Sequence, residues 1–137
     1  MLIHALEYAK KGWHVFPLVP GQKIPLTKNG FKDATTDPQK ITEWWTKTPN
    51  ANIGIATGKI SGICVLDVDV KNGAQGMESL KKLPPLHVTL AVKTPSGGLH
   101  LYFTCPKPMP SKNNFMPGLD FKADGGYVVA PDSSLII

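Results

Sequence analysis

The chain has 137 residues, of which 42% are apolar, and its net charge is +5. A chain of this length is expected to form one domain that buries about two-thirds of its unfolded surface, and this composition excludes wholesale disorder. All of its basic residues are lysines, which excludes two-pronged guanidinium contacts to phosphate or guanine, while the positive balance suits either a phosphate-rich partner or a merely solvated surface.

The first half of the chain predicts helices that alternate with short strands. Apolar spacing indicates the helices, and a glycine or proline marks the end of most elements. The expected elements are a helix over 2–11 stopped by Gly12, a strand over 13–16 closed by Pro17, a helix from the Asp37-Pro38 cap to just before Pro49, and a strand over 53–56.

The second half is richer in strands. The expected elements are a helix over 76–83 and strands over 63–70, 88–93, 100–103, 118–122 and 127–129. Asp124-Gly125-Gly126 is expected to join the last two strands as a hairpin, and the Pro- and Asn-rich residues 106–117 to form a mobile loop. This mixture of helices and strands, with hairpins late in the chain, predicts an α+β fold.

Several features concern the location of the protein. No apolar run approaches the roughly 20 residues that a membrane helix needs. The first lysines, Lys10 and Lys11, follow apolar residues, which is the wrong order for a secretory signal, so a cytoplasmic protein without membrane contact is expected. Cys64 and Cys105 form neither a zinc motif nor a disulfide framework and are expected to be free thiols, with Cys64 in the core. The three tryptophans are interpreted as core residues.

The strand over 63–70 has one apolar face and one face that turns acidic toward its C-terminal end. Asp67 and Asp69 lie on that second face, about 6.6 Å apart along the strand. Two such carboxylates can share a pair of divalent ions. A strand end that merely reaches solvent would carry the same pair, so the motif alone leaves both interpretations open.

Asp120 repeats this pattern in Gly118-Leu119-Asp120-Phe121-Lys122, where it alternates with two apolar residues that face the core. A third carboxylate from a neighbouring strand could complete a metal site. The other interpretation is an exposed hairpin with a local ion pair between Asp120 and Lys122, worth well under about 1 kcal/mol.

A glycine-containing loop, Ser96-Gly97-Gly98, precedes His100 at the start of a strand. The glycines permit a positive φ and the close approach of a ligand, and successive amides can bind an anion. His100 is then well placed to touch a phosphate oxygen. A tight hairpin turn followed by a buried, hydrogen-bonded histidine fits the same residues.

Taken together, these motifs resemble the N-terminal domain of bifunctional DNA primase/polymerases, a branch of the archaeo-eukaryotic primase superfamily found on plasmids, phages and prophages. The similarity covers nearly the whole chain. Its blocks are residues 5–9, 12–18, Lys23, Pro25, 34–35, Trp44-Trp45, 51–58, 61–62, 65–69, 94–103, 118–122 and 125–131.

This resemblance implies an RRM-like catalytic sheet of mixed or antiparallel strands flanked by helices, and it assigns roles to the motifs. Asp67, Asp69 and Asp120 would bind two divalent ions, Mg²⁺ or Mn²⁺. His100 would hold the triphosphate of the incoming nucleotide, helped by Ser96 and the amides of Gly97 and Gly98. The partners would be a single-stranded DNA template, nucleoside triphosphates and a possible helicase, which longer relatives often carry in the same chain.

The chain departs from the family pattern in two places. Lys122 stands where the family usually has arginine, so weaker triphosphate binding is expected if this residue contacts it. Relatives also continue for some tens of residues, so residues 1–137 are expected to be a catalytic domain truncated at its C-terminus, with Leu135-Ile136-Ile137 as an interrupted strand.

Two alternative functions are weighed against a polymerase. A catalytically incomplete module that binds nucleotide or single-stranded DNA would carry the same motifs. A toprim-type phosphoesterase also uses two aspartates at a strand end, but it needs a glutamate on an earlier strand. Glu7, Glu43 and Glu78 all fall in expected helices, which disfavours that class.

Overall fold

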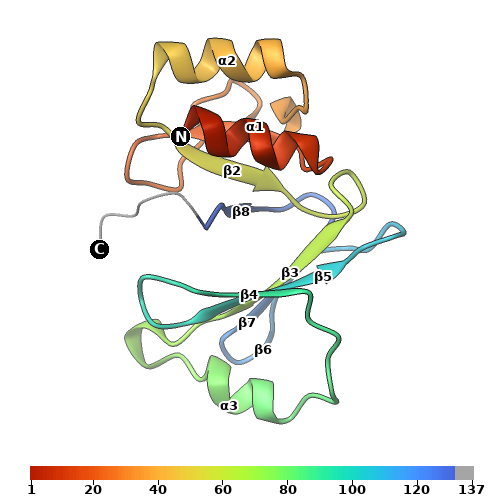
Figure 1. The fold of residues 1–137 in the computed structure, drawn as a ribbon. Coiled ribbons are helices and arrows are strands. Elements are labelled where there is room, and N and C mark those ends of the chain that lie inside the picture. Colours follow the sequence, from red (N-terminus) through yellow and green to blue (C-terminus); the bar gives the residue numbers. More distant parts are fainter. Residues whose placement is uncertain (132–137) are drawn as a thin grey trace. The chain divides into compact units, whose positions relative to one another are not determined.

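The computed structural model describes residues 1–131. Over these residues the chain forms two compact units, one comprising Met1–Ala56 and 126–131 and the other Thr57–Gly125. Over the described residues, three α-helices and two antiparallel sheets confirm the predicted α+β class (Figure 1). The strand expected at Leu135-Ile136-Ile137 lies outside the described residues.

The first unit is a three-stranded antiparallel sheet with two helices. Its strands, in the order β1-β2-β8, are Val15–Leu18, Asn52–Ala56 and Tyr127–Val129, and its helices are α1, Leu2–Lys10, and α2, Pro38–Lys47. The helices pack against each other and against β1, and a short 3₁₀ turn, η1, covers Gly30–Asp33. Helix α2 begins as predicted, because the Asp37 carboxylate accepts a hydrogen bond from the Gln39 amide at 3.0 Å.

The prediction that Pro17 closes the first strand is wrong, because β1 runs through it to Leu18. Pro17 lies opposite Ile53, and its carbonyl accepts a hydrogen bond from the Leu26 amide rather than from β2. Since β1 is an edge strand of this sheet, the missing proline N–H removes no bond from the ladder. The core prediction for the tryptophans is confirmed for Trp45, which is buried, whereas Trp13 and Trp44 are half-buried.

The second unit is a five-stranded antiparallel sheet in the order β4-β5-β3-β7-β6. These strands are Leu90–Lys93, Leu99–Thr104, Ile63–Val68, Leu119–Lys122 and Lys112–Met116, joined by a 3₁₀ turn, η2, at Lys71–Gly73 and by α3, Gly76–Lys81. Leu66, Val68, Leu101 and Leu119 form a buried cluster against which Leu80 and Leu83 pack. The α3 segment therefore covers the face of the sheet to which these four side chains belong.

The predicted hairpin through Asp124-Gly125-Gly126 is wrong. Strand β7 pairs with β3 and β6, whereas β8 pairs with β2 in the other sheet. The Asp124 carboxylate accepts hydrogen bonds from the amides of Lys59, at 2.9 Å, and Met109, at 3.1 Å. Long-range contacts of this aspartate therefore replace the short-range turn that its sequence favours.

The prediction of a mobile loop over 106–117 is wrong for its second half. Residues Lys112–Met116 form the edge strand β6, which pairs irregularly with β7 through Lys112↔Phe121 and Met116↔Leu119. Asn114 has a φ of +49° within this irregularity. Asparagine tolerates that left-handed conformation better than most residues, so a strand with a bulge forms where the composition indicated only a loop.

Cys64 and Cys105 are both buried and free, as predicted. Burial and the neighbouring Cys105 raise the pKa of the Cys64 thiol to about 12. Residues 1–131 contain no helix that is both long and apolar enough to cross a membrane.

Candidate active site

The central feature of the second unit is a row of polar residues across three adjacent strands. Asp67 of β3 lies directly opposite His100 of β5 on one side and Asp120 of β7 on the other. Directly opposed residues in an antiparallel sheet share a face, with Cβ atoms about 4.5–5.5 Å apart. These three residues, predicted separately from three motifs, therefore form one row on the face opposite the buried leucine cluster.

A second row on the same face lies two residues along each strand. Val65 pairs with Tyr102 on β5 and with Lys122 on β7. Tyr102 is 1% exposed, and burial raises the pKa of its hydroxyl. Lys122 thus belongs to the same face as Asp67 and Asp120, in one row with the buried Val65 and Tyr102.

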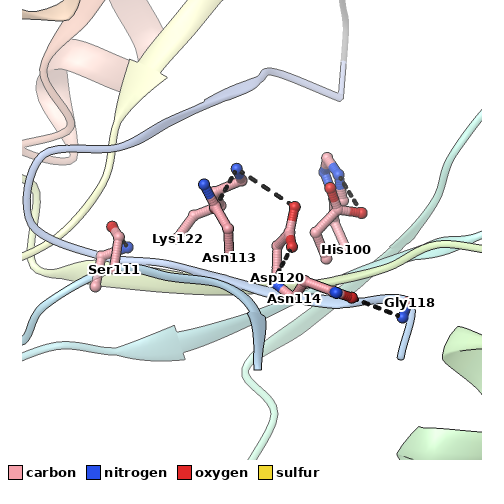
Figure 2. A network of polar contacts seen from close by, with 9 residues as sticks. His100, Ser111, Asn113, Asn114, Gly118, Asp120 and Lys122 are labelled. Atoms are coloured by element: carbon pink, nitrogen blue, oxygen red, sulfur yellow. Dashed lines mark hydrogen bonds and ion pairs between the residues drawn. The ribbon is translucent and has the colours of Figure 1, made fainter. Parts of the chain in front are cut away.

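Each carboxylate of the first row faces a nitrogen donor. His100 Nε2 lies 3.4 Å from Asp67 Oδ1, and Lys122 Nζ lies 3.7 Å from Asp120 Oδ2. Figure 2 shows His100, Asp120 and Lys122 on the same side of the sheet. The side chains of Asp67 and Asp120 are 30% and 35% exposed, against 16% for His100. The aspartates therefore remain accessible to a ligand, and the nearby donors offset their mutual repulsion.

Asp69 lies just beyond this row. Strand β3 ends at Val68, two residues earlier than predicted, because the chain turns into η2. The Asp69 carboxylate is exposed and accepts a hydrogen bond from the Lys71 amide at 2.8 Å. The structure thus brings Asp67, His100, Asp120 and Lys122 together, and it places Asp69 past the strand end in a bond of its own local turn.

The backbone of Asp69 is held by two glycines. Its amide donates to the Gly118 carbonyl at 2.8 Å, and its carbonyl accepts from the Gly76 amide at 2.9 Å. Gly118 has a φ of +78°, and a Cβ there would collide with the backbone of Gly76. A glycine is therefore required at position 118 for the chains to approach this closely, and that approach fixes where Asp69 leaves the sheet.

The Ser96-Gly97-Gly98 loop connects β4 to β5 as a tight hairpin, one of the two interpretations left open by the sequence. The Gly97 amide donates to the Thr94 carbonyl, and the Thr94 amide donates to the Gly98 carbonyl, both at 2.9 Å. A Cβ on Gly98 would collide with the carbonyl oxygen of Val68. The loop thus lies against the end of β3, with Ser96 exposed beside it.

Two residues that sequence reasoning missed complete the polar network. The Asn114 amide donates to Asp120 Oδ1 at 2.6 Å, and Asn113 Oδ1 accepts from Lys122 Nζ at 3.4 Å (Figure 2). Both lie in β6, within the segment expected to be a loop. The adjacent asparagines six and seven residues before Asp120 were the available signal, since asparagine is typical of turns.

The carboxylates of this face suit hard divalent cations. Mg²⁺ and Mn²⁺ prefer carboxylate oxygens, and Asp67 and Asp120 offer two carboxylates in direct register, with Asp69 just past the end of β3. Over residues 1–131, no three His, Cys, Asp or Glu side chains are already gathered as a metal cluster. The residues therefore fit such ions by chemistry and by shared face, and Asp69 would supply the third carboxylate.

Comparison with known proteins identifies the family of the chain. Residues 5–135 match the family described as bifunctional DNA primase/polymerase, N-terminal. A comparison with curated proteins gives no match. Because the family match covers nearly the whole chain, the protein belongs to the bifunctional DNA primase/polymerase N-terminal (Prim-Pol) family, whose members are enzymes that act on DNA and nucleotides.

Proposed function

We propose that this chain catalyses template-directed nucleotidyl transfer by a two-metal mechanism, making or extending primers on single-stranded DNA. The observation that carries the proposal is the single row formed by His100, Asp67 and Asp120 across β5, β3 and β7. Family membership supports the reaction class, and the row supports a reaction centre on one face of one sheet.

In this proposal Asp67, Asp69 and Asp120 hold two Mg²⁺ or Mn²⁺ ions. When bound, such ions lower the charge on the attacking and leaving oxygens of a phosphoryl transfer. The 3′-hydroxyl of the primer would attack the α-phosphate of the nucleoside triphosphate and release its proton to solvent. The phosphodiester bond forms as the bond between the α-phosphorus and the bridging oxygen breaks, and pyrophosphate leaves. In priming, a second nucleotide takes the place of the primer terminus.

The nitrogen donors on the same face would hold the triphosphate. His100 and Lys122 both come from the sheet, where strand pairing fixes their positions, and each can donate to a phosphate oxygen. Ser96 would add a hydroxyl donor, and Gly97 would let the phosphates approach the backbone. The Gly97 amide already closes the hairpin, and the Val68 carbonyl occupies the space beside Gly98, so Ser96 and the space beside Gly97 matter most in this loop.

The proposal extends to the fold type and the biological setting. The five-stranded antiparallel sheet, with α3 packed on one face and the polar row on the other, supports an RRM-like catalytic sheet of the archaeo-eukaryotic primase type. We assign residues 1–137 to one catalytic domain, and the replication of a plasmid, phage or prophage as its setting, with a helicase as a possible partner.

A second candidate function is a module that binds nucleotide or single-stranded DNA without turnover. The specific observation in its favour is that each carboxylate of the row is already paired, Asp67 with His100 and Asp120 with Lys122. Metal ligation by either carboxylate would compete with these pairs. The two functions differ in whether a divalent ion and a nucleoside triphosphate yield pyrophosphate.

The deciding experiment is primer extension on a single-stranded template with Mn²⁺ and with Mg²⁺, comparing the wild type with Asp67→Ala. We expect extension by the wild type and its loss in Asp67→Ala, and likewise in Asp69→Ala, with folding confirmed by circular dichroism. Glu78→Ala is the matched control, because it removes an exposed carboxylate from α3, on the other face of the sheet.

Each result discriminates between the functions. Extension that persists in a folded Asp67→Ala variant would remove the two-metal proposal. No extension by the wild type, together with metal-dependent nucleotide binding, would favour the binding module.

A further inference from the structure

The residue that stands out beyond the predicted motifs is Asn114, in the irregular part of β6. Its φ of +49° places it in the left-handed region, where among residues 1–131 the only other non-glycine residue is Asn72. Most side chains are strained there, and β-branched ones most of all. A residue held in this conformation next to a candidate catalytic group requires a physical reason.

Two hydrogen bonds connect Asn114 to the polar row. Its backbone amide donates to Asp120 Oδ1 at 2.6 Å, a short bond of the charge-assisted kind. Its own side-chain oxygen accepts from the Gly118 amide at 3.4 Å. The first bond fixes one oxygen of Asp120, and the second closes the chain between Asn114 and the start of β7.

The other oxygen of Asp120 faces a different environment. Asp120 Oδ2 lies 3.7 Å from Lys122 Nζ, which is itself within 3.4 Å of Asn113 Oδ1. The carboxylate is therefore held asymmetrically, with Oδ1 tied to the backbone and Oδ2 beside a long, mobile cation. An ammonium group at that distance gives way to a ligand more easily than a short backbone hydrogen bond does.

We propose that Asn114 is a positioning residue, whose left-handed backbone aims its amide at Asp120 and so presents Asp120 Oδ2 to a divalent ion. The inference rests on the proposed function, in which Asp120 is a metal ligand. Groups that hydrogen-bond to a ligating carboxylate orient it, and losing such a group costs about 10–100-fold in metal affinity or activity. The backbone amide makes the contact, and the residue type matters because it permits the conformation.

The test compares two substitutions of Asn114. Asn114→Gly keeps the amide and accepts the positive φ, and it loses only the long side-chain bond to Gly118. Asn114→Val places a β-branched residue at a φ of +49° and displaces the amide. Binding of Mn²⁺ alone to each folded variant is followed by electron paramagnetic resonance, with primer extension as a second measurement.

We expect Asn114→Val to weaken Mn²⁺ binding about 10–100-fold and Asn114→Gly to stay within about threefold of the wild type. In an Asp120→Asn background, Asn114→Val should cause no further loss, because a positioning residue acts only through the group that it positions. If the valine variant does not fold, Asn114→Ala is the milder substitution, because alanine is strained at a positive φ but has no β-branch. Its loss of Mn²⁺ affinity should likewise disappear in the Asp120→Asn background.

The outcomes separate this inference from the proposed function. If Asp120→Asn weakens Mn²⁺ binding while folded Asn114→Val binds as tightly as the wild type, the positioning role fails and the proposed function stands. A loss of equal size in the glycine and valine variants, or one that persists beside Asp120→Asn, also overturns it. If Asp120→Asn binds Mn²⁺ as the wild type does, the proposed role of Asp120 fails and the inference falls with it.

Discussion

The two faces of the five-stranded sheet differ although they are built from alternate residues of the same strands. One face carries Leu66, Leu101 and Leu119 and packs against the α3 segment. The other carries Asp67, His100 and Asp120, each directly next in sequence to one of these leucines. Adjacent residues of one strand thus belong to opposite faces, so that one residue stabilises the fold and the next lies in the candidate site. Packing of the apolar face also fixes the register that aligns the polar row.

The largest expected effect is on the free energy of unfolding, for a substitution on the apolar face. Leu119 is fully buried, so Leu119→Ala removes apolar contacts, leaves a cavity and should lower the free energy of unfolding by about 2–5 kcal/mol. Urea denaturation followed by circular dichroism measures the change. Leu86→Ala is the control on an exposed leucine, for which a change within about 0.5 kcal/mol is expected.

Substitutions on the polar face should have a smaller effect on the free energy of unfolding. Asp67→Asn keeps the shape of a part-exposed side chain, so the free energy of unfolding should change by less than about 1 kcal/mol. A loss as large as that of Leu119→Ala would show that the polar row also supports the fold. The separation of the two faces would then be wrong.

His100 gives the next effect, on substrate binding. If His100 holds the triphosphate, His100→Gln should raise the KM for the nucleotide about tenfold with a smaller change in kcat, because the lost contact is present before the transition state. Steady-state primer extension at varied nucleotide concentration measures both constants. An unchanged KM would indicate a histidine that serves the sheet through Asp67, 3.4 Å away.

The pH dependence of stability at the buried Cys64 thiol tests the apolar face. Burial raises the pKa of its thiol from 9.0 to about 12, so the folded state keeps the proton when the unfolded state loses it. The stability contribution of this thiol is therefore complete below pH 9 and falls as the pH rises above 9. Relative to Cys64→Ala, the wild type should lose about 1 kcal/mol of unfolding free energy between pH 8 and pH 10.

Chemical denaturation of both proteins across this range measures the difference between them. Tyr102 is present in both proteins, so its contribution cancels in that difference. A constant difference from pH 8 to pH 10 would show that the Cys64 thiol is not protected from deprotonation in the folded state.

Strand alternation predicted which residues share a face within each strand, because it is a local property of the chain, but it failed for Asp69, which lies past the end of β3. Register is not local, so the sequence could not show that Asp67 lies directly opposite both His100 and Asp120. Nor could it locate the end of β3, where the carbonyl of Gly118, far away in sequence, and the amide of the nearby Gly76 hold the backbone of Asp69. The roles of these residues in catalysis remain predictions.

The errors in the fold have a similar cause. Asp124-Gly125-Gly126 is a strong local turn pattern, but the Asp124 carboxylate binds the amides of Lys59 and Met109, one of which is 65 residues away in the chain. Strand β6 lacks alternation because its bulge places Asn114 in the left-handed region. In both cases a contact with another part of the unit outweighs the local preference.

Lys122 offers the smallest effect and the finest test of the polar face. Its ammonium group lies 3.7 Å from Asp120 and 3.4 Å from Asn113, and it shares a face with His100. Lys122→Arg keeps the charge and adds a planar fork that can bind a phosphate through two bonds, so the KM for the nucleotide should fall about threefold. The same fork can also bind Asp120 through two bonds, and a raised KM with weaker Mn²⁺ binding would show that the substituted residue competes for the carboxylate instead. Lys112→Arg, on the exposed end of β6, is the control for added guanidinium, and it should leave the KM unchanged.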